Sequence, residues 1–175
     1  MSIKDKEKLN SDLMDEELDD EETEDMQEDK YLTFHLHNEE YGIEIKHVTE
    51  IIGIQNITAV PDMPNYIKGV INLRGKVIPV MDVRVRFLMP ELQYNDRTCI
   101  IVINVNGQLI GLIVDYVSEV LDIPKSNVEP PPKINKGMGS KFIQGMGKVG
   151  DKVKILLNAD KLLFEEDLEK LSKIN

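Results

Sequence analysis

Cysteine, tryptophan and long apolar runs are scarce or absent in this sequence. The 175 residues contain one cysteine, Cys99, and no tryptophan, so an internal disulfide framework is excluded. No apolar run approaches the roughly 18 residues of a membrane-spanning helix, and the first residues lack the charged and apolar regions of a secretory signal. The chain is long enough for one ordinary domain, or for two very small units that share a core. We expect a soluble, cytoplasmic protein.

Charge is distributed very unevenly along the chain. Residues 1–29 hold 14 of the 32 acidic residues but only three of the 21 basic ones, so the net charge of −11 resides there. This segment has too few apolar residues to offset its ordering entropy, and we predict a disordered acidic tail over 1–29. The remaining 18 acidic and 18 basic residues balance. The folded part therefore lacks the electrostatic footprint of a nucleic-acid or anionic-lipid binder, and no membrane insertion is expected.

Two parts of the sequence repeat the same strand pattern. From Tyr31, apolar and polar residues alternate with period two, and the chain then returns to form a hairpin. A shift of 69 residues lays this hairpin and its apolar connector on a second copy: Gly42, Ile45, Val48 and Glu50 fall on Gly111, Val114, Val117 and Glu119. A later hairpin has its own counterpart at a shift of 76: Gly69, Val77 and Val80 fall on Gly145, Val153 and Leu156. These matches predict an internal duplication.

Each half thus consists of a hairpin, an apolar connector and a second hairpin. Closing such short strands into a barrel removes exposed sheet edges and fills the interior with the alternating apolar side chains. We predict an all-β protein with two small barrels, at about 31–90 and 98–157. A turn of helix is expected after Asp82, and an amphipathic C-terminal helix is expected over about 158–173 with Asn158 as its cap.

Motifs that could carry chemistry have simpler explanations. "GMGKVG" at 145–150 matches a dinucleotide-binding pattern, but a strand follows it where a phosphate-binding loop would open a helix, so these glycines are assigned to the bend and bulge of a hairpin. His35 and His37 lack a nearby carboxylate or cysteine at metal-ligand spacing and are expected to face solvent. Cys99 begins an apolar strand with no catalytic partner in the sequence. These interpretations argue against an enzyme.

Arg74 is the unexplained residue of the apolar hairpin "IKGVINLRGKVIPVMDVR" (67–84). Its guanidinium must either reach solvent or be paired, because an isolated buried charge is costly. Glu50, near the end of the preceding apolar connector, is the candidate partner. Two alternatives stay open: an exposed arginine in a turn, or an ion pair that fixes the connector against the hairpin.

Several segments resemble the CheW family of chemotaxis coupling proteins, in the family's order and spacing. These are "EEYGIEIKHVTEI", "MPNYIKGVINLRGKVIPVMDVRVRF", "YNDRTCIIVI" and "GLIVDYVSEVL", and the resemblance covers about 30–174. It implies two SH3-like five-stranded barrels that share a hydrophobic core, without catalysis and without a cofactor. It also implies a cytoplasmic adaptor, recruited to membrane-associated arrays, that joins transmembrane chemoreceptors to the histidine kinase CheA.

The resemblance also suggests where the partners bind. Receptor tips are helical hairpins and would dock in an apolar groove between the barrels, and the matching motifs give the receptor-side candidates Ile45, Val48, Glu50, Gly69, Val70 and Arg74. Gly69 would let another backbone come close. The regulatory domain of the kinase is similar to this fold, so the two would pack barrel against barrel. Loops at the barrel ends are the expected kinase contacts, and the Pro-rich loop from Glu129 to Ile134 is the candidate.

Two other classes of function make different predictions. An oligonucleotide-binding barrel would cluster basic residues with exposed aromatic ones on one face, which the balanced charge after residue 29 does not favour. An enzyme whose site is assembled only in space would have a deep pocket with perturbed ionisable groups.

Overall fold

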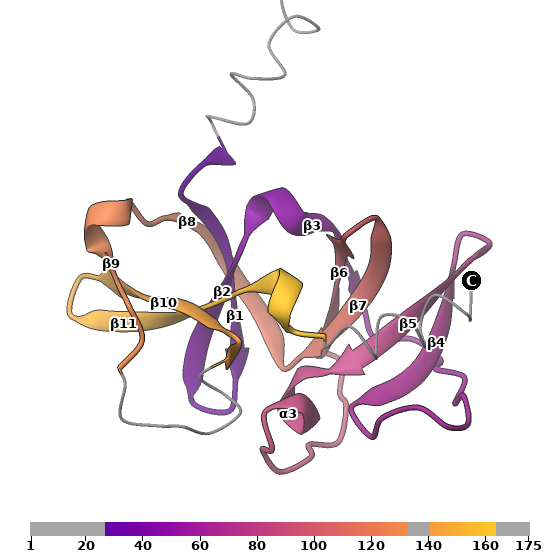
Figure 1. Cartoon of the computed structure of the whole chain (residues 1–175). Coiled ribbons are helices and arrows are strands. Elements are labelled where there is room, and N and C mark those ends of the chain that lie inside the picture. The colour runs from indigo at the N-terminus through magenta and orange to yellow at the C-terminus, as the bar shows by residue number, and fades with distance from the viewer. Residues whose placement is uncertain (1–26, 133–140, 164–175) are drawn as a thin grey trace, which may run out of the picture.

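The two halves of the chain contribute the same series of strands. The computed structural model describes residues 27–132 and 141–163. The first half contains β1 (Lys30–Leu36), β2 (Glu39–Glu44), β3 (Val48–Gly53), β4 (Ile67–Leu73) and β5 (Lys76–Asp82) (Figure 1). The second half contains β6 (Cys99–Val105), β7 (Gln108–Val114), β8 (Tyr116–Asp122), β9 (Val128–Glu129), β10 (Ile143–Val149) and β11 (Lys152–Leu157). A shift of 69 residues places β1 on β6, and a shift of 76 places β4 on β10. The order of strands is therefore the one that the predicted duplication requires.

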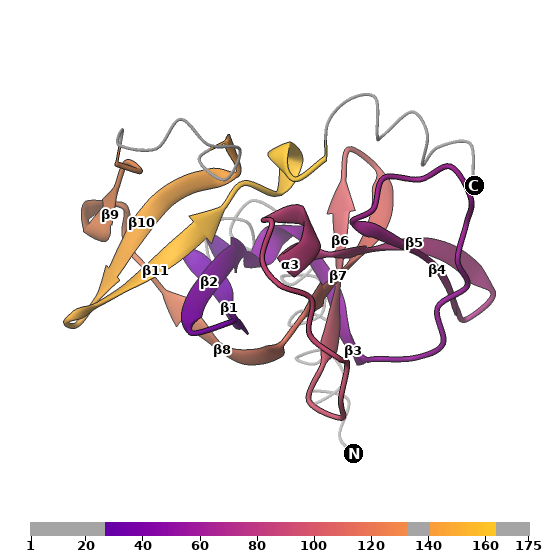
Figure 2. The same ribbon diagram turned by 90° about the horizontal axis from the view of Figure 1, so that it is seen from below.

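Each half gives its first hairpin to the sheet of the other half. The first sheet, sheet A, has the order β8-β1-β2-β11-β10-β9, and the second, sheet B, has the order β3-β6-β7-β5-β4. The hairpins join at parallel pairings, β2 with β11 and β5 with β7, whereas the neighbours within a hairpin are antiparallel. Figures 1 and 2 show the two sheets side by side, with α3 between them. The predicted all-β class is confirmed.

The predicted barrel boundaries, about 31–90 and 98–157, do not coincide with these sheets. Sheet A combines β1 and β2 with strands beyond residue 115, and sheet B combines β6 and β7 with strands before residue 83. The alternation of apolar and polar residues identifies each hairpin but is the same in both copies. It therefore cannot tell which copy of the first hairpin completes which sheet.

A pair of equivalent glycines makes the exchanged contacts possible. In the parallel ladders Gly42 pairs with Leu156, and Gly111 pairs with Val80. A Cβ at Gly42 would lie 2.9 Å from Leu156 Cδ2, and one at Gly111 would lie 2.8 Å from Val80 Cγ1. Leu156 and Val80 are fully buried. The absent side chains thus leave room for a bulky apolar residue where the two halves meet.

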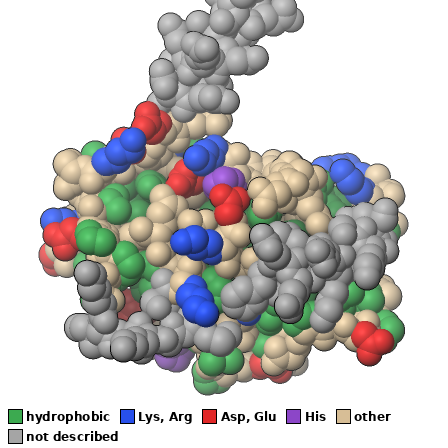
Figure 3. Space-filling view, viewed as in Figure 1, with side chains coloured by type: hydrophobic (Ala, Val, Ile, Leu, Met, Phe, Trp, Pro, Cys, Tyr) green, Lys and Arg blue, Asp and Glu red, His purple; other side chains and the backbone are tan. Residues whose placement is uncertain are grey.

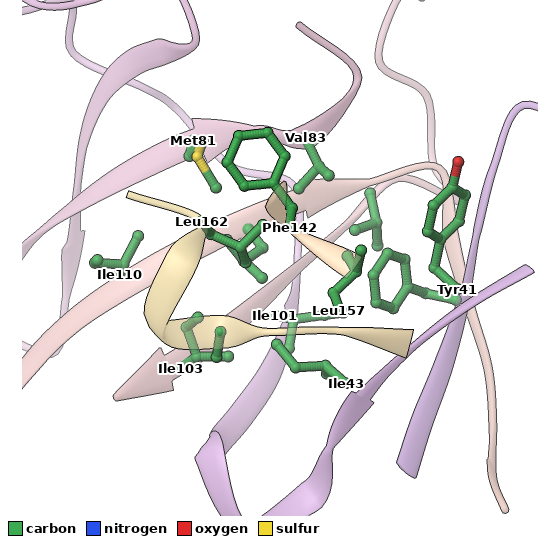
Figure 4. Close-up of a cluster of buried hydrophobic side chains, with 14 of the residues drawn as sticks. Tyr41, Ile43, Met81, Val83, Ile101, Ile103, Ile110, Phe142, Leu157 and Leu162 are labelled. Carbon is green, nitrogen blue, oxygen red and sulfur yellow. The ribbon is translucent and has the colours of Figure 1, made fainter. Parts of the chain in front are cut away.

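The largest cluster of buried side chains lies between the sheets and belongs to both. Figure 4 shows Tyr41 and Ile43 from β2 packed with Ile101, Ile103 and Leu157. Phe142 stacks on Phe87 with ring centroids 5.5 Å apart. Smaller clusters fill each unit, one around Val80 in sheet B and one around Leu156 in sheet A. The expected shared core is therefore present.

The helices that lie wholly within the described residues are short turns next to the strands. They are η1 (Ile45–His47), η2 (Lys125–Asn127) and η4 (Ala159–Lys161), which are 3-10 helices, and α3 (Val83–Arg86). The expected turn of helix after Asp82 is present, and Asp82 caps it through hydrogen bonds from Arg84 N and Val85 N. Asn158 accepts from Asp160 N and is a cap as predicted, but the helix that it caps within the described residues is the 3-10 turn η4. Among the described residues, no helix is long and apolar enough to cross a membrane. The predicted C-terminal helix beyond residue 163 and the predicted tail up to residue 26 lie outside the described residues. The predicted tail boundary at residue 29 is wrong, because Glu28 pairs with Lys125 and the backbone oxygen of Asp29 accepts a hydrogen bond from Ile123 N.

A buried ion pair joins the two halves beside the core. Arg84 donates from Nε and Nη2 to the two carboxylate oxygens of Asp115, at 2.6 and 2.5 Å. Asp115 also accepts from the backbone N–H of His37, at the tip of the β1–β2 hairpin. Burial alone would raise the pKa of Asp115, but these hydrogen bonds outweigh it and the pKa lies below its ordinary value. The ionised carboxylate therefore stabilises the fold.

We expect Asp115→Asn to lower the free energy of unfolding by about 3 kcal/mol at neutral pH, because the buried Arg84 guanidinium loses its counter-charge. Asp122→Asn is the matched control: Asp122 pairs with Lys30 on the surface, and its loss should cost no more than about 1 kcal/mol. Denaturant titration measures both.

The contribution of Asp115 also has a defined pH dependence. Because its folded pKa is lowered, this stability is present above the ordinary carboxyl pKa and is lost as the pH falls through the folded pKa. The difference between the wild type and Asp115→Asn should therefore shrink in acid below about pH 4. A difference that stays constant down to pH 2 would contradict this account.

Candidate functional site

The residues proposed for the receptor side gather around the two edges of sheet B. Ile45 lies on η1, Val48 and Glu50 lie on β3, Gly69 and Val70 lie on β4, and Arg74 lies in the turn between β4 and β5. In the order of sheet B, β3 and β4 are the two outermost strands. Figure 2 shows the segment between them running along the outside of the unit. Residues on these two outermost strands can lie close together only if the sheet curls round and its two edges meet.

Closure of sheet B takes place at Thr58. The backbone of Thr58 exchanges two hydrogen bonds with Val70 on β4, at 2.9 and 2.8 Å, and forms an isolated bridge there. In sheet A the equivalent contact is β9, where Glu129 pairs with Met146. Both edges of each sheet are thus connected through a short segment, which makes a small barrel of each unit.

Gly69 is required for this closure. Its φ is 146°, and a Cβ would lie 2.0 Å from Thr58 O and 2.6 Å from Thr58 C. The close backbone predicted at Gly69 is therefore present, but it belongs to this chain. Gly69 is buried, so it acts by allowing the Thr58 backbone to approach β4 and not by direct contact with a partner.

An ion pair links the same two edges on the outside. Arg74 donates from Nη2 to both carboxylate oxygens of Glu50, each at 2.7 Å. Both open alternatives hold together: Arg74 is paired with Glu50, and its side chain is 72% exposed, whereas that of Glu50 is 25% exposed. An exposed pair of this kind contributes at most about 1 kcal/mol to folding. Its main effect is to hold a guanidinium and a carboxylate at a fixed place on the surface.

Half-buried apolar residues lie on the strands that carry this ion pair, or directly before them. Ile45 and Val48 are half-buried, and their inner atoms pack against the shared core. Val70, which bonds to Thr58, is also half-buried. A partner that covers these side chains would bury apolar surface around a preset charged pair, which is the composition expected of a specific protein-binding site.

The kinase-side candidates have a different setting. Glu129 lies on β9 and not in a free loop, and its carboxylate accepts from Lys148 Nζ at 2.9 Å. The predicted Pro-rich loop from Glu129 to Ile134 thus begins on a strand, which η2 precedes. Ile134 lies outside the described residues.

Four exposed apolar residues had not been singled out from the sequence. They are 44–51% exposed and occupy equivalent positions in the two halves: Ile51 and Val120, Val77 and Val153. The shifts of 69 and 76 residues already align them. The alternation along the strands also places these four apolar residues on the outer face. Apolar residues that face outward at equivalent positions of both copies are the signal that could have identified them.

Residues considered as ligands or nucleophiles have local structural roles. His35 is half-buried, contacts Glu40 at 3.0 Å and stacks on Tyr116, so the expectation that it faces solvent is wrong. Burial, and then the nearby Lys154 charge, lower its pKa. Cys99 donates to Arg97 O. The glycines of 145–150 lie on β10 and in its turn, with a bulge between Ile143 and Gly145, as predicted.

Glu44 has a shifted pKa that its hydrogen-bond partners explain. Burial raises the pKa of Glu44, but hydrogen bonds from Gln144 and Lys46 outweigh it and lower the pKa overall. These three residues line an open cavity of about 790 Å³ near the start of β1. Within the described part of the chain, no three His, Cys, Asp or Glu side chains gather as a metal site would require.

Comparison with known proteins identifies the family. A model of the CheW-like domain matches residues 30–167. The chain belongs to the CheW family. The chemotaxis protein CheW of Klebsiella aerogenes is 37% identical over 139 residues, which cover 79% of this chain and 84% of that protein. The CheW of Treponema pallidum is 32% identical over 147 residues, covering 82% and 86%.

A solved CheW structure shares the fold. The scaffolding protein TtCheW from Thermoanaerobacter tengcongensis superposes with a TM-score of 0.73 at 36% identity, covering 79% of this chain and 94% of that one. The predicted CheW resemblance and the fold class with two small barrels are thereby confirmed. Family membership assigns the chain a scaffold's role in chemotaxis.

The role of Gly69 can be tested by its effect on folding. We expect Gly69→Ala to lower the free energy of unfolding by more than about 3 kcal/mol, since the new methyl group would overlap the Thr58 backbone at a φ that favours glycine. Gly53→Ala is the control, because a Cβ there meets nothing within 4 Å. Equal stabilities of the two variants would show that Gly69 is free for a partner.

Proposed function

We propose that this protein is a non-catalytic adaptor that couples chemoreceptors to the histidine kinase CheA. The observation that carries the proposal is the Arg74–Glu50 pair, set among half-buried apolar side chains at the closed edge of sheet B. The adaptor acts without a cofactor, in the cytoplasm, and is recruited to membrane-associated receptor arrays. TtCheW, a scaffolding protein by name, supports the same general role.

The receptor side is assigned to Ile45, Val48, Glu50, Val70 and Arg74. A receptor tip is a helical hairpin, so its apolar stripe can cover Val48 and its neighbours while polar groups on its flank meet the charged pair. Because Glu50 and Arg74 already hold each other, their positions are set before binding and little ordering entropy is lost. Gly69 contributes indirectly, because it allows the Thr58 backbone to close onto β4.

The kinase side is assigned to sheet A. Figure 1 shows the β10–β11 hairpin and the β4–β5 hairpin at opposite ends of the molecule, so a partner on one end leaves the other accessible. Val120 and Val153 supply exposed apolar surface in sheet A. They suit a barrel-to-barrel contact with the kinase regulatory domain better than Glu129, whose carboxylate is occupied by Lys148. Ile134 stays a prediction.

An oligonucleotide-binding role is the weaker candidate. On the face shown in Figure 3, Lys and Arg side chains are scattered among acidic, apolar and other groups. Among the described residues, every Tyr and Phe is buried or half-buried. A base-stacking surface needs exposed aromatic rings beside a basic groove, so this surface does not suit single-stranded nucleic acid.

Val48→Asp should abolish binding of a receptor signalling fragment while binding of the kinase regulatory domain persists. The new carboxylate would have to be desolvated against an apolar helix, which costs at least about 3 kcal/mol and weakens binding by a factor of about 100 or more. Titration of the purified full chain against each partner separately measures both affinities.

Val117→Asp is the matched control for that experiment. Val117 is the duplicated counterpart of Val48, and it too is half-buried against the shared core. It should bring a similar loss of stability but leave receptor binding intact. The proposal is wrong if Val48→Asp removes both interactions in a protein that circular dichroism shows to be folded.

A further inference from the structure

The turn that carries Arg74 has a conformation that arginine does not favour. Leu73 pairs with Lys76, so Arg74 and Gly75 are the two residues of the loop between β4 and β5. Their φ angles are 52° and 85°, both left-handed, as in a type I′ turn. Such turns prefer Asn-Gly, because asparagine and glycine tolerate a positive φ. Every residue with a Cβ meets steric resistance in this conformation, and arginine lacks the short polar side chain by which asparagine offsets it with a local hydrogen bond.

A second turn of the same protein provides an internal comparison. Between β6 and β7, Val105 pairs with Gln108, and Asn106 and Gly107 have φ angles of 52° and 84°. This turn has the preferred Asn-Gly sequence at the same geometry. The two turns differ at the first loop residue, where arginine stands in one and asparagine in the other.

One side-chain hydrogen bond is common to both turns. Asn72 Oδ1 accepts from Gly75 N at 2.8 Å, and Asn104 Oδ1 accepts from Gly107 N at 2.9 Å. In the β6–β7 turn, Asn106 favours the conformation by itself. In the β4–β5 turn, Arg74 does not favour the left-handed conformation. The hydrogen bond to Asn72 therefore contributes more to stabilising that conformation.

We propose that Asn72 is a positioning residue for Arg74. Its side-chain oxygen holds the loop in the left-handed conformation from which the guanidinium reaches Glu50 at 2.7 Å. If the loop relaxed to negative φ at Arg74, the Cα–Cβ bond would point in another direction and the guanidinium would leave Glu50. This inference deepens the proposed receptor site and rests on it for its functional consequence, while the conformational part stands on the turn alone.

The first arm of the test does not need a receptor. In NMR spectra of the full chain, the HN–Hα coupling and the Cβ shift of Arg74 report the sign of φ. We expect a positive φ in the wild type, a shift toward negative φ in Asn72→Ala, and retention of the positive φ in Asn72→Asp, which keeps an acceptor oxygen. A positive φ that persists in Asn72→Ala overturns the proposal.

The second arm measures binding of a purified chemoreceptor signalling fragment. Asn72→Ala should weaken binding by about three- to tenfold, the range expected for one lost hydrogen bond. Asn72→Asp should restore most of the affinity, and Asn72→Ala should add no further weakening to Arg74→Ala. Asn104→Ala removes the same bond from the other turn and should leave affinity unchanged.

The outcomes separate this inference from the proposed function. If Asn72→Asp weakens binding as much as Asn72→Ala while φ stays positive, Asn72 contacts the receptor through its amide N–H groups and the positioning role is wrong. If φ changes as expected but Arg74→Ala binds the fragment normally, the positioning role stands and the proposed receptor site is wrong.

Discussion

The exchange of hairpins between the two halves is the constraint on which the rest of the structure depends. Neither half can complete its own sheet, because β2 needs β11 and β5 needs β7 as parallel neighbours. The core that results belongs to both units, and the buried Arg84–Asp115 pair crosses the same boundary. Two barrels of this size would bury little apolar surface separately. Joined through exchanged strands, they form one body with two outer ends.

In a fold joined in this way, an ion pair that adds little stability can still contribute to recognition of a partner. The Arg74–Glu50 pair is too exposed to stabilise the fold appreciably. Its charges are nevertheless held in place, because β3 is anchored to β6 and β4 is closed onto Thr58 behind Gly69. The rigid elements thus determine where a side chain of modest energetic value is presented to a partner. Under the proposed function, this division of roles would account for an arginine at a turn position that suits asparagine.

The sequence was sufficient for the strands, the duplication and the cap at Asn158, since each depends on local pattern, and it named Glu50 as the candidate partner of Arg74 from charge alone. It was insufficient for the exchange, because both copies of the first hairpin alternate in the same way. The neighbour of Gly69 could not be inferred either: a glycine shows that something comes close, but not whether Thr58 or a partner does. His35 was misjudged for a similar reason, as Glu40 and Tyr116 reach it only through pairing of the strands.

We propose that the two ends of the molecule hold two partners at once. The most direct measurement is the affinity of the full chain for a receptor signalling fragment, first alone and then with the protein saturated by the kinase regulatory domain. We expect a ternary complex, with the two affinities for the receptor fragment equal within about twofold. Displacement of the receptor fragment in proportion to kinase occupancy would show that the two partners share one site, and would contradict the account.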